Sequence, residues 1–225
     1  MTTFFLQLLA AWILLVVAHV SAMALAGVAL GVDLREVSYG FGKELFSRGK
    51  LKIKAVPLGG YAKFGDTRET EADPPADPAT AFNHKPVAIQ AIIVLAGCAV
   101  LVLLAALVLA GASVSEVVEG FRQIVVGALG PKSTAQEYIH ALYALSTTHG
   151  FPALLAVLAT KVAAFNLLPL PVLNGGQALL AFVPTDRNVY PDWQIPLMNI
   201  GIVLMLALAG SWGFAILLFL AGGKL

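Results

Sequence analysis

The sequence is dominated by long runs of apolar residues. The hydrocarbon core of a bilayer is about 30 Å thick, and a helix needs about 20 mostly apolar residues to cross it. Three runs meet this requirement clearly, and a shorter fourth contains Lys161 and Asn166. The four predicted spans are Phe4–Leu30, Val87–Ala112, Phe151–Pro169 and Pro196–Ala221. We therefore expect an all-α polytopic membrane protein with about four transmembrane helices.

The composition supports a lipid-covered surface. Only 12% of the 225 residues are charged, against about 25% in a typical soluble domain. The formal net charge of +1 gives no reason to expect a nucleic-acid partner. We expect the lipid bilayer and other membrane proteins as partners instead. The single cysteine, Cys98, lies in an apolar run and indicates neither a disulfide nor a CxxC metal site.

The loop between the first two spans holds most of the positive charge. Nine of the 14 Lys and Arg residues lie within Asp33–Pro86, and basic loops stay on the cytoplasmic side. This predicts a cytoplasmic loop over residues 33–86, with both chain termini and residues 113–150 on the outer side. The first apolar run has no basic start and is too long for a signal peptide, so we expect a retained helix.

The cytoplasmic loop carries strand patterns. Leu51–Val56 alternates apolar and basic side chains, which is typical of a half-buried strand. Val37–Gly42 and Gly59–Phe64 mix strand-forming residues with glycines and indicate two further short strands. Together they predict a small membrane-associated β-sheet after the first helix. Glu69–Pro78 is acidic and proline-rich and is expected to be a solvated linker.

The outer segment carries two helix patterns. Apolar residues recur at helical spacing over Val114–Leu129, and Gly130 with Pro131 breaks the pattern. Thr134–Leu145 is predicted to form a second short helix.

Several separated motifs occur in a specific order. Tyr39-Gly-Phe-Gly42 and Val56-Pro-Leu-Gly-Gly-Tyr61 follow the first apolar run, and Ala81-Phe-Asn-His-Lys-Pro86 precedes the second, which contains Ala96-Gly97. Asn166-Leu-Leu-Pro-Leu-Pro-Val-Leu-Asn-Gly-Gly176 ends the third. In order, spacing and topology they resemble the site-2 protease family of intramembrane zinc metalloproteases, whose third-helix motif is NxxPxPxLDGG.

The resemblance runs from about Ala18 to Gly176. It implies one site-2-protease-like membrane domain over residues 1–225, in the inner membrane of a bacterium. Active bacterial relatives often carry PDZ modules between the second and third spans. The interval Ser113–Gly150 is too short for one.

The family's chemical residues are replaced at the matching positions. In the family, HExxH supplies two zinc ligands and a general base, the aspartate of LDGG supplies the third ligand, and an asparagine stabilises the oxyanion. Here the HExxH run begins with His19 but has Val20 in place of the glutamate and Met23 in place of the second histidine. The aspartate position is Asn174, and the oxyanion position falls at Leu101.

The resemblance therefore implies a degenerate site with no catalytic residue, no metal and no cofactor. We expect His19 to be buried and hydrogen-bonded to a neighbouring polar group such as Asn174. The positions that handle substrate in the family are better preserved in this chain. We give equal weight to two interpretations of them, that they maintain the fold and that they bind a client. The candidate client-binding residues are Gly59, Gly60, Tyr61, Asn166, Pro169 and Pro171.

Three functions remain open at this point. The leading hypothesis is a pseudoprotease that binds membrane proteins as a scaffold subunit. The runner-up is an active intramembrane zinc endopeptidase with non-standard ligands. The third is a conduit for a small molecule or ion through the vacated site, although its path would hold one histidine and no acidic residue. Bound metal would favour the protease, and a stoichiometric protein partner would favour the scaffold.

Overall fold

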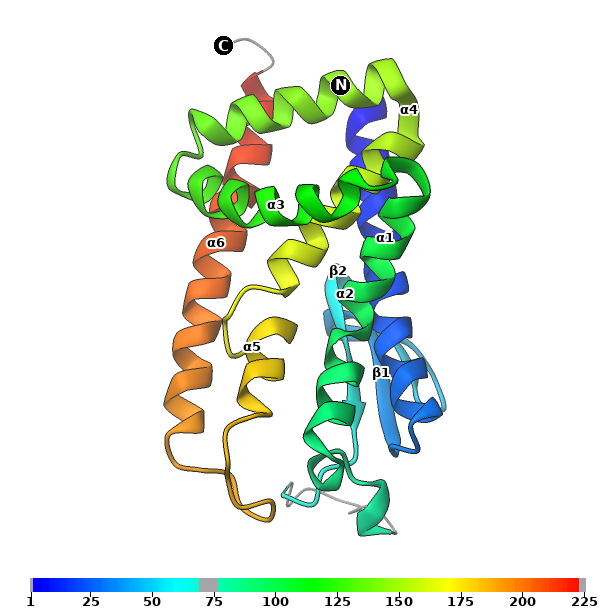
Figure 1. The fold of residues 1–225 in the computed structure, drawn as a ribbon. Coiled ribbons are helices and arrows are strands. Elements are labelled where there is room, and N and C mark those ends of the chain that lie inside the picture. Colours follow the sequence, from blue (N-terminus) through cyan, green and yellow to red (C-terminus); the bar gives the residue numbers. More distant parts are fainter. Residues whose placement is uncertain (1, 69–76, 223–225) are drawn as a thin grey trace.

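Four long helices form the body of the molecule (Figure 1). The computed structural model describes residues 2–68 and 77–222. Each of the four helices is long and apolar enough to cross a membrane, which confirms the predicted number of spans. They are α1 (Thr2–Ala29), α2 (Val87–Leu109), α4 (Thr134–Asn166) and α6 (Gln194–Gly222).

Small residues let three of these helices approach closely. Leu15 of α1 and Leu101 of α2 pack against Ala159, Ala163 and Ala164 of α4 in the main apolar core. Alanines allow helix backbones to come together inside a membrane, where van der Waals packing drives association. Helix α6 is buried mainly near its C-terminal end, where Ala215 and Phe219 join a second cluster around Phe4.

Helix α4 consists of two helices joined at a sharp bend. Gly150 has φ 76° and ψ −175°, and Pro152 follows it. The first half corresponds to the predicted short helix, and the second half is the predicted third span. That span ends at Asn166 rather than at Pro169, because the prolines of the following loop cannot continue a helix.

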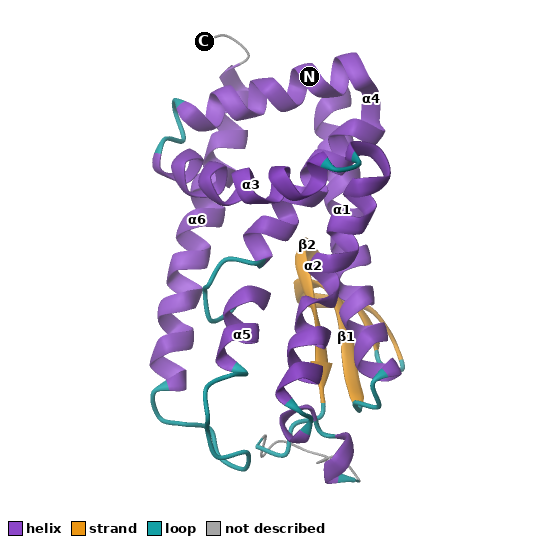
Figure 2. Ribbon diagram, in the orientation of Figure 1, coloured by secondary structure: helices purple, strands orange, loops and turns teal. Residues whose placement is uncertain are grey.

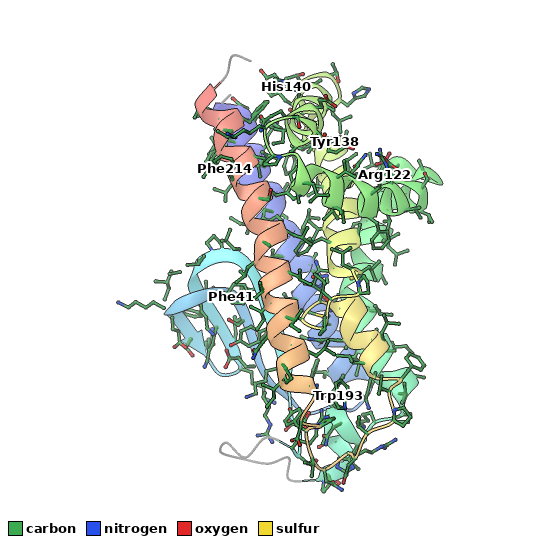
Figure 3. The ribbon with its side chains drawn as sticks, turned by 90° about the vertical axis from the view of Figure 1, so that its left-hand side faces the viewer. Phe41, Arg122, Tyr138, His140, Trp193 and Phe214 are labelled. Atoms are coloured by element: carbon green, nitrogen blue, oxygen red, sulfur yellow. The ribbon has the colours of Figure 1, made fainter. Side chains whose placement is uncertain are left out.

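The β-sheet has two long strands rather than the three short ones predicted. Strand β1 (Leu34–Arg48) pairs antiparallel with β2 (Leu51–Phe64). Residues 37–39 lie opposite both 60–62 and 51–53, with several register shifts, so the sheet folds back on itself. Figure 3 shows it projecting to one side of the helices, with Phe41 on it.

The remaining elements are short or lie across the bundle. Helix α3 (Ala112–Leu129) crosses the other helices, and α5 (Asn174–Leu180) is a short helix between two loops (Figure 2). Two 3-10 turns, η1 (Pro78–Thr80) and η2 (Phe82–His84), lead into α2. Most of the predicted acidic linker lies at residues 69–76, outside the described residues.

Candidate functional site

Asn174 connects three helices through its side-chain amide. It is the first residue of α5, and its Oδ1 lies 3.2 Å from Nε2 of His19 on α1. Its Nδ2 donates to the Sδ of Met23 at 2.9 Å and to the carbonyl oxygen of Val94 on α2 at 2.7 Å. The predicted contact between His19 and Asn174 is confirmed. The three positions that match zinc ligands therefore come together in space.

These contacts determine which nitrogen of His19 carries the proton. Both N–H groups of Asn174 are used by Met23 and Val94, so the amide presents an acceptor oxygen to the histidine. Nε2 of His19 must then be the donor. The imidazole is 7% exposed, and its Nδ1 has no hydrogen-bond partner among the residues that the structure describes. A Cβ on Gly97 would lie 2.5 Å from Nδ1, so this glycine makes room for the ring.

Hydrocarbon occupies the other two matched positions. Val20 is 1% exposed and Leu101 is fully buried. A Cβ built on Gly60 of β2 would lie 3.1 Å from Cγ2 of Val20 and 2.4 Å from the carbonyl oxygen of Ser38. The sheet therefore packs directly against α1 at the position of the family's general base. Neither Val20 nor Leu101 can accept a proton or donate a hydrogen bond from its side chain.

The glycines after Asn174 hold it in place. A Cβ on Gly175 would lie 2.2 Å from the carbonyl oxygen of Leu167, and one on Gly176 would lie 2.0 Å from that of Leu170. Only glycine permits such close backbone approach. The loop after α4 thus folds tightly against the start of α5, which aims Asn174 at α1 and α2.

The candidate client-binding residues of the sheet contact different groups. Gly59 packs against the ring of Phe41. Tyr61 donates from its hydroxyl to Glu36 at 2.7 Å and accepts from Lys54 at 2.8 Å. The hydroxyl of Tyr61 is therefore engaged within the sheet.

The candidates of the third-helix motif also have local contacts. Asn166 donates to the carbonyl of Val162 in its own helix at 2.9 Å. Pro171 lies against Gly201 of α6, where a Cβ would come within 3.0 Å of its Cδ. Pro169 is exposed. These contacts account for part of the motif through the fold alone, and its role in client binding stays a prediction.

Sequence reasoning missed the backbone carbonyl of Val94, which carries no signal in a sequence. It also missed two contacts that hold the sheet on α1. The hydroxyls of Ser21 and Tyr39 lie 2.6 Å apart, and Trp12 donates to the carbonyl of Pro57 at 3.0 Å. The sheet is thus attached to α1 on both sides of Val20.

A buried asparagine links two loops at the end of the bundle where α2 begins. Asn83 is 4% exposed and donates to the hydroxyl of Thr67 at 2.6 Å and to the carbonyl of Arg187 at 2.7 Å. Arg187 in turn donates to the carbonyl of His84 at 3.0 Å. The loop between α5 and α6 is therefore tied to the segment before α2.

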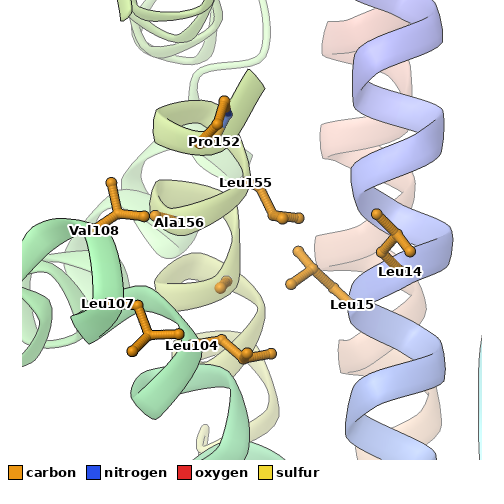
Figure 4. Close-up of a pocket in the computed structure, with 9 residues that line it drawn as sticks. Leu14, Leu15, Leu104, Leu107, Val108, Pro152, Leu155 and Ala156 are labelled. Carbon is orange, nitrogen blue, oxygen red and sulfur yellow. The ribbon is translucent and has the colours of Figure 1, made fainter. Parts of the chain in front are cut away.

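An apolar cavity of about 220 Å³ lies between α1, α2 and α4 (Figure 4). It begins one helical turn from His19, at Leu15. Its lining residues are Leu14, Leu15, Leu104, Leu107, Val108, Pro152, Leu155, Ala156 and Ala159. This lining offers no side chain for acid, base or metal chemistry.

Comparison with known proteins places the chain in a family. A family model described as "Peptidase family M50" matches residues 7–208. The chain belongs to peptidase family M50, the site-2 proteases. The match extends from α1 into α6, beyond the motifs that carry the resemblance in the sequence.

One curated relative is the protein named "Putative zinc metalloprotease PM1991" of Pasteurella multocida (strain Pm70). It is 40% identical over 72 residues, which make up 30% of this chain. The chain spans only 16% of that relative's length.

The residues of this M50 site do not fit a zinc ion. A catalytic zinc needs three protein ligands and an open fourth position. The positions here offer one imidazole, whose Nε2 is hydrogen-bonded, one thioether and one neutral amide. Among the described residues, no group of three or more His, Cys, Asp or Glu side chains is placed to hold a metal.

Proposed function

We propose that this chain is a catalytically silent member of the site-2 protease family. In this proposal it acts as a membrane-embedded binding or scaffold subunit of a membrane protein complex. The observation that carries the proposal is the closed hydrogen-bond network of Asn174 with His19, Met23 and Val94. The amide that replaces the family's aspartate stabilises helix packing in place of a metal.

The hydrogen-bond network leaves few ligand atoms free for a metal ion. Zinc at Nε2 of His19 would displace the hydrogen bond to Asn174, and the amide oxygen would bring no negative charge. The thioether of Met23 is not among the side-chain groups that proteins usually use to bind zinc, which are Cys thiolate, His nitrogen and Asp or Glu oxygen. The buried side chain of Val20 cannot activate water. These points favour a silent homologue over an endopeptidase with non-standard ligands.

Exposed apolar side chains support a binding role for the sheet. Phe41, Leu45 and Leu58 are 46%, 66% and 68% exposed. An extended client can add to a sheet through backbone hydrogen bonds, which supply affinity with little demand on sequence. The exposed Pro169 offers a second contact point on the broken third span. We include Gly59, Gly60, Tyr61, Asn166 and Pro171 in this proposed client surface.

The orientation in the membrane is part of the proposal. We place the segment 33–86 on the cytoplasmic side of a bacterial inner membrane, as its basic residues favour. Helix α1 begins and α6 ends at the same end of the bundle, and α2 begins at the other (Figure 1). Both chain termini would then lie on the outer side. A cysteine at Lys132 should react with an impermeant reagent in intact cells, and one at Lys50 should not.

Site-specific photo-cross-linking tests the binding role. A photoreactive residue at Leu58 should cross-link one intact membrane protein that also co-purifies in stoichiometric amount. The control position is Leu103, which is 66% exposed on α2, away from the sheet, and should give lipid adducts only. A cross-linked partner that has been cut within its own membrane span would support the endopeptidase instead.

A further inference from the structure

One face of helix α3 is buried, and the two flanks beside that face differ in polarity. The helix is too polar to count among the four spans. Its buried residues recur every three or four positions, as expected for one helical face. They are Ser113, Val117, Gly120, Ile124 and Gly127.

One flank of α3 is apolar and uncovered. Val114, Val118, Val125 and Leu129 are 63%, 63%, 41% and 83% exposed. At about 100° per residue they fall within a sector of roughly 60°, beside the buried face. Glu116, Glu119 and Gln123 fall in a similar sector on the other side of that face. A helix with this distribution lies flat in a membrane interface, with one flank in hydrocarbon and the other toward water.

The contacts with α6 indicate the depth of α3. Trp212 donates to the carbonyl of Ile124 at 2.9 Å, and Ser211 donates to the carbonyl of Ala128 at 2.6 Å. Ser211 is seventeen residues beyond Gln194, the first residue of α6, which corresponds to about 26 Å along the helix. The hydrocarbon core is about 30 Å thick. Helix α3 therefore lies near the edge of that core, at the end where α1 begins (Figure 1).

The contacts with α4 indicate which flank points toward water. Gly120 packs on α4 between Ala164 and Lys161. Because α4 descends from this membrane edge, Lys161 lies nearer the edge than Ala164. Glu116 accepts from Nζ of Lys161 at 2.7 Å, so the polar flank is directed toward the edge. The flank of Val114, Val118, Val125 and Leu129 is then directed into the hydrocarbon.

We infer that α3 is an interfacial helix whose apolar flank is covered by phospholipid acyl chains of one leaflet. This flank continues the exposed apolar surface of α2, where Leu107 and Val108 are 83% and 50% exposed. The partner is the lipid itself, and the inference does not depend on whether the chain is a scaffold or a protease. Helix α3 rests in the leaflet and braces α4 and α6 at that edge.

Spin-label accessibility in lipid nanodiscs tests this assignment. Single cysteines at Val118 and Val125, in a Cys98→Ala background, would carry a nitroxide probe. The expected result is high collision with oxygen and low collision with a water-soluble nickel chelate at both positions. Labels at Glu119 and Gln123 should show the reverse. Leu107 is the lipid-facing reference, and Lys132, exposed in the turn before α4, is the water-facing reference.

Two results would overturn the inference. Nickel accessibility at Val118 and Val125 as high as at Lys132 would place the flank in water. Protection from both reagents would show that protein covers it, either a partner or a second copy of the chain. Cross-linking at Leu58 would be measured in the same variants. If it is unchanged, either of these results would contradict only the lipid-facing assignment of α3 and would not bear on the proposed client surface.

Discussion

Nε2 of His19 lies 3.2 Å from Oδ1 of Asn174, although the two residues are 155 positions apart in the chain. Asn174 is close in shape to the aspartate of the family motif but differs in hydrogen bonding. Its Nδ2 can donate to Met23 and to the carbonyl of Val94, which a carboxylate cannot do. The change from acid to amide thus turns a ligand position into a connection between α1, α2 and α5.

Replacing Asn174 with Asp should destabilise the protein. The variant loses both donors and places a carboxyl oxygen opposite the carbonyl of Val94, at a cost of about 2 to 3 kcal/mol. Thermal unfolding in detergent micelles measures the loss. Asn166→Asp is the matched control, because Asn166 donates to one carbonyl at the end of its own helix. A more stable Asn174→Asp protein that also binds zinc would argue for a latent metal site.

Replacing His19 with Ala should weaken the fold modestly and leave partner binding intact. The change removes one hydrogen bond and leaves a cavity beside Gly97, which together should lower the free energy of unfolding by about 1 to 3 kcal/mol. The measurement is the amount of co-purifying partner per mole of protein. His149→Ala, at an exposed position next to the bend in α4, should change neither quantity. Loss of cellular function at a normal protein level would instead indicate that His19 has a chemical role.

Replacing Gly60 with Ala should shift the sheet away from α1. The added Cβ would lie 2.4 Å from the backbone oxygen of Ser38 and 3.1 Å from Val20. Overpacking of this kind costs about 1 to 3 kcal/mol. Limited proteolysis of the sheet formed by β1 and β2 should become faster. Gly111→Ala, which meets nothing within 4 Å, is the control, and equal rates for the two variants would rule out the tight contact.

The charge network on the sheet should make its stability depend on pH. Burial of Glu36 raises its pKa, but hydrogen bonds from Tyr61 and Lys52 and the charges of Lys52 and Lys54 outweigh this, so the pKa of Glu36 is lowered. A lowered pKa in the folded state stabilises the protein at neutral pH. That contribution is lost as the pH falls through the carboxylate range toward the lowered value.

Glu36→Gln tests this network. The variant should be less stable than the parent at neutral pH, and the difference in unfolding temperature should shrink as the solution is acidified. Glu137→Gln, at an exposed position on α4, controls for a general effect of removing a carboxylate. A difference that stays constant from pH 7 to pH 4 would contradict the role of Glu36.

The sequence predicts the parts of this structure that have a local signal. Apolar run length predicts the four spans, and the motif around Asn174 predicts its contact with His19. The sheet was only partly predicted. The predicted short strand Val37–Gly42 contains Gly40 and ends at Gly42, whereas both glycines, at φ 92° and 81°, lie within the long strand β1.

Contacts between distant backbone groups could not be predicted. The carbonyl of Val94 completes the network of Asn174, but every residue has such a carbonyl. The partner of Lys161 was also missed, because Glu116 belongs to α3 and pairing depends on where that helix crosses α4. Client binding at the exposed Pro169 would be a contact with another molecule, so it stays a prediction.

Native mass spectrometry of the protein, extracted gently from its own membrane, tests the central claim most directly. It reports bound metal and bound protein in one measurement, before purification removes either. The proposal predicts a mass without zinc and with one stoichiometric membrane-protein partner. One zinc ion per chain would contradict it and would return His19 and Asn174 to the role of metal ligands.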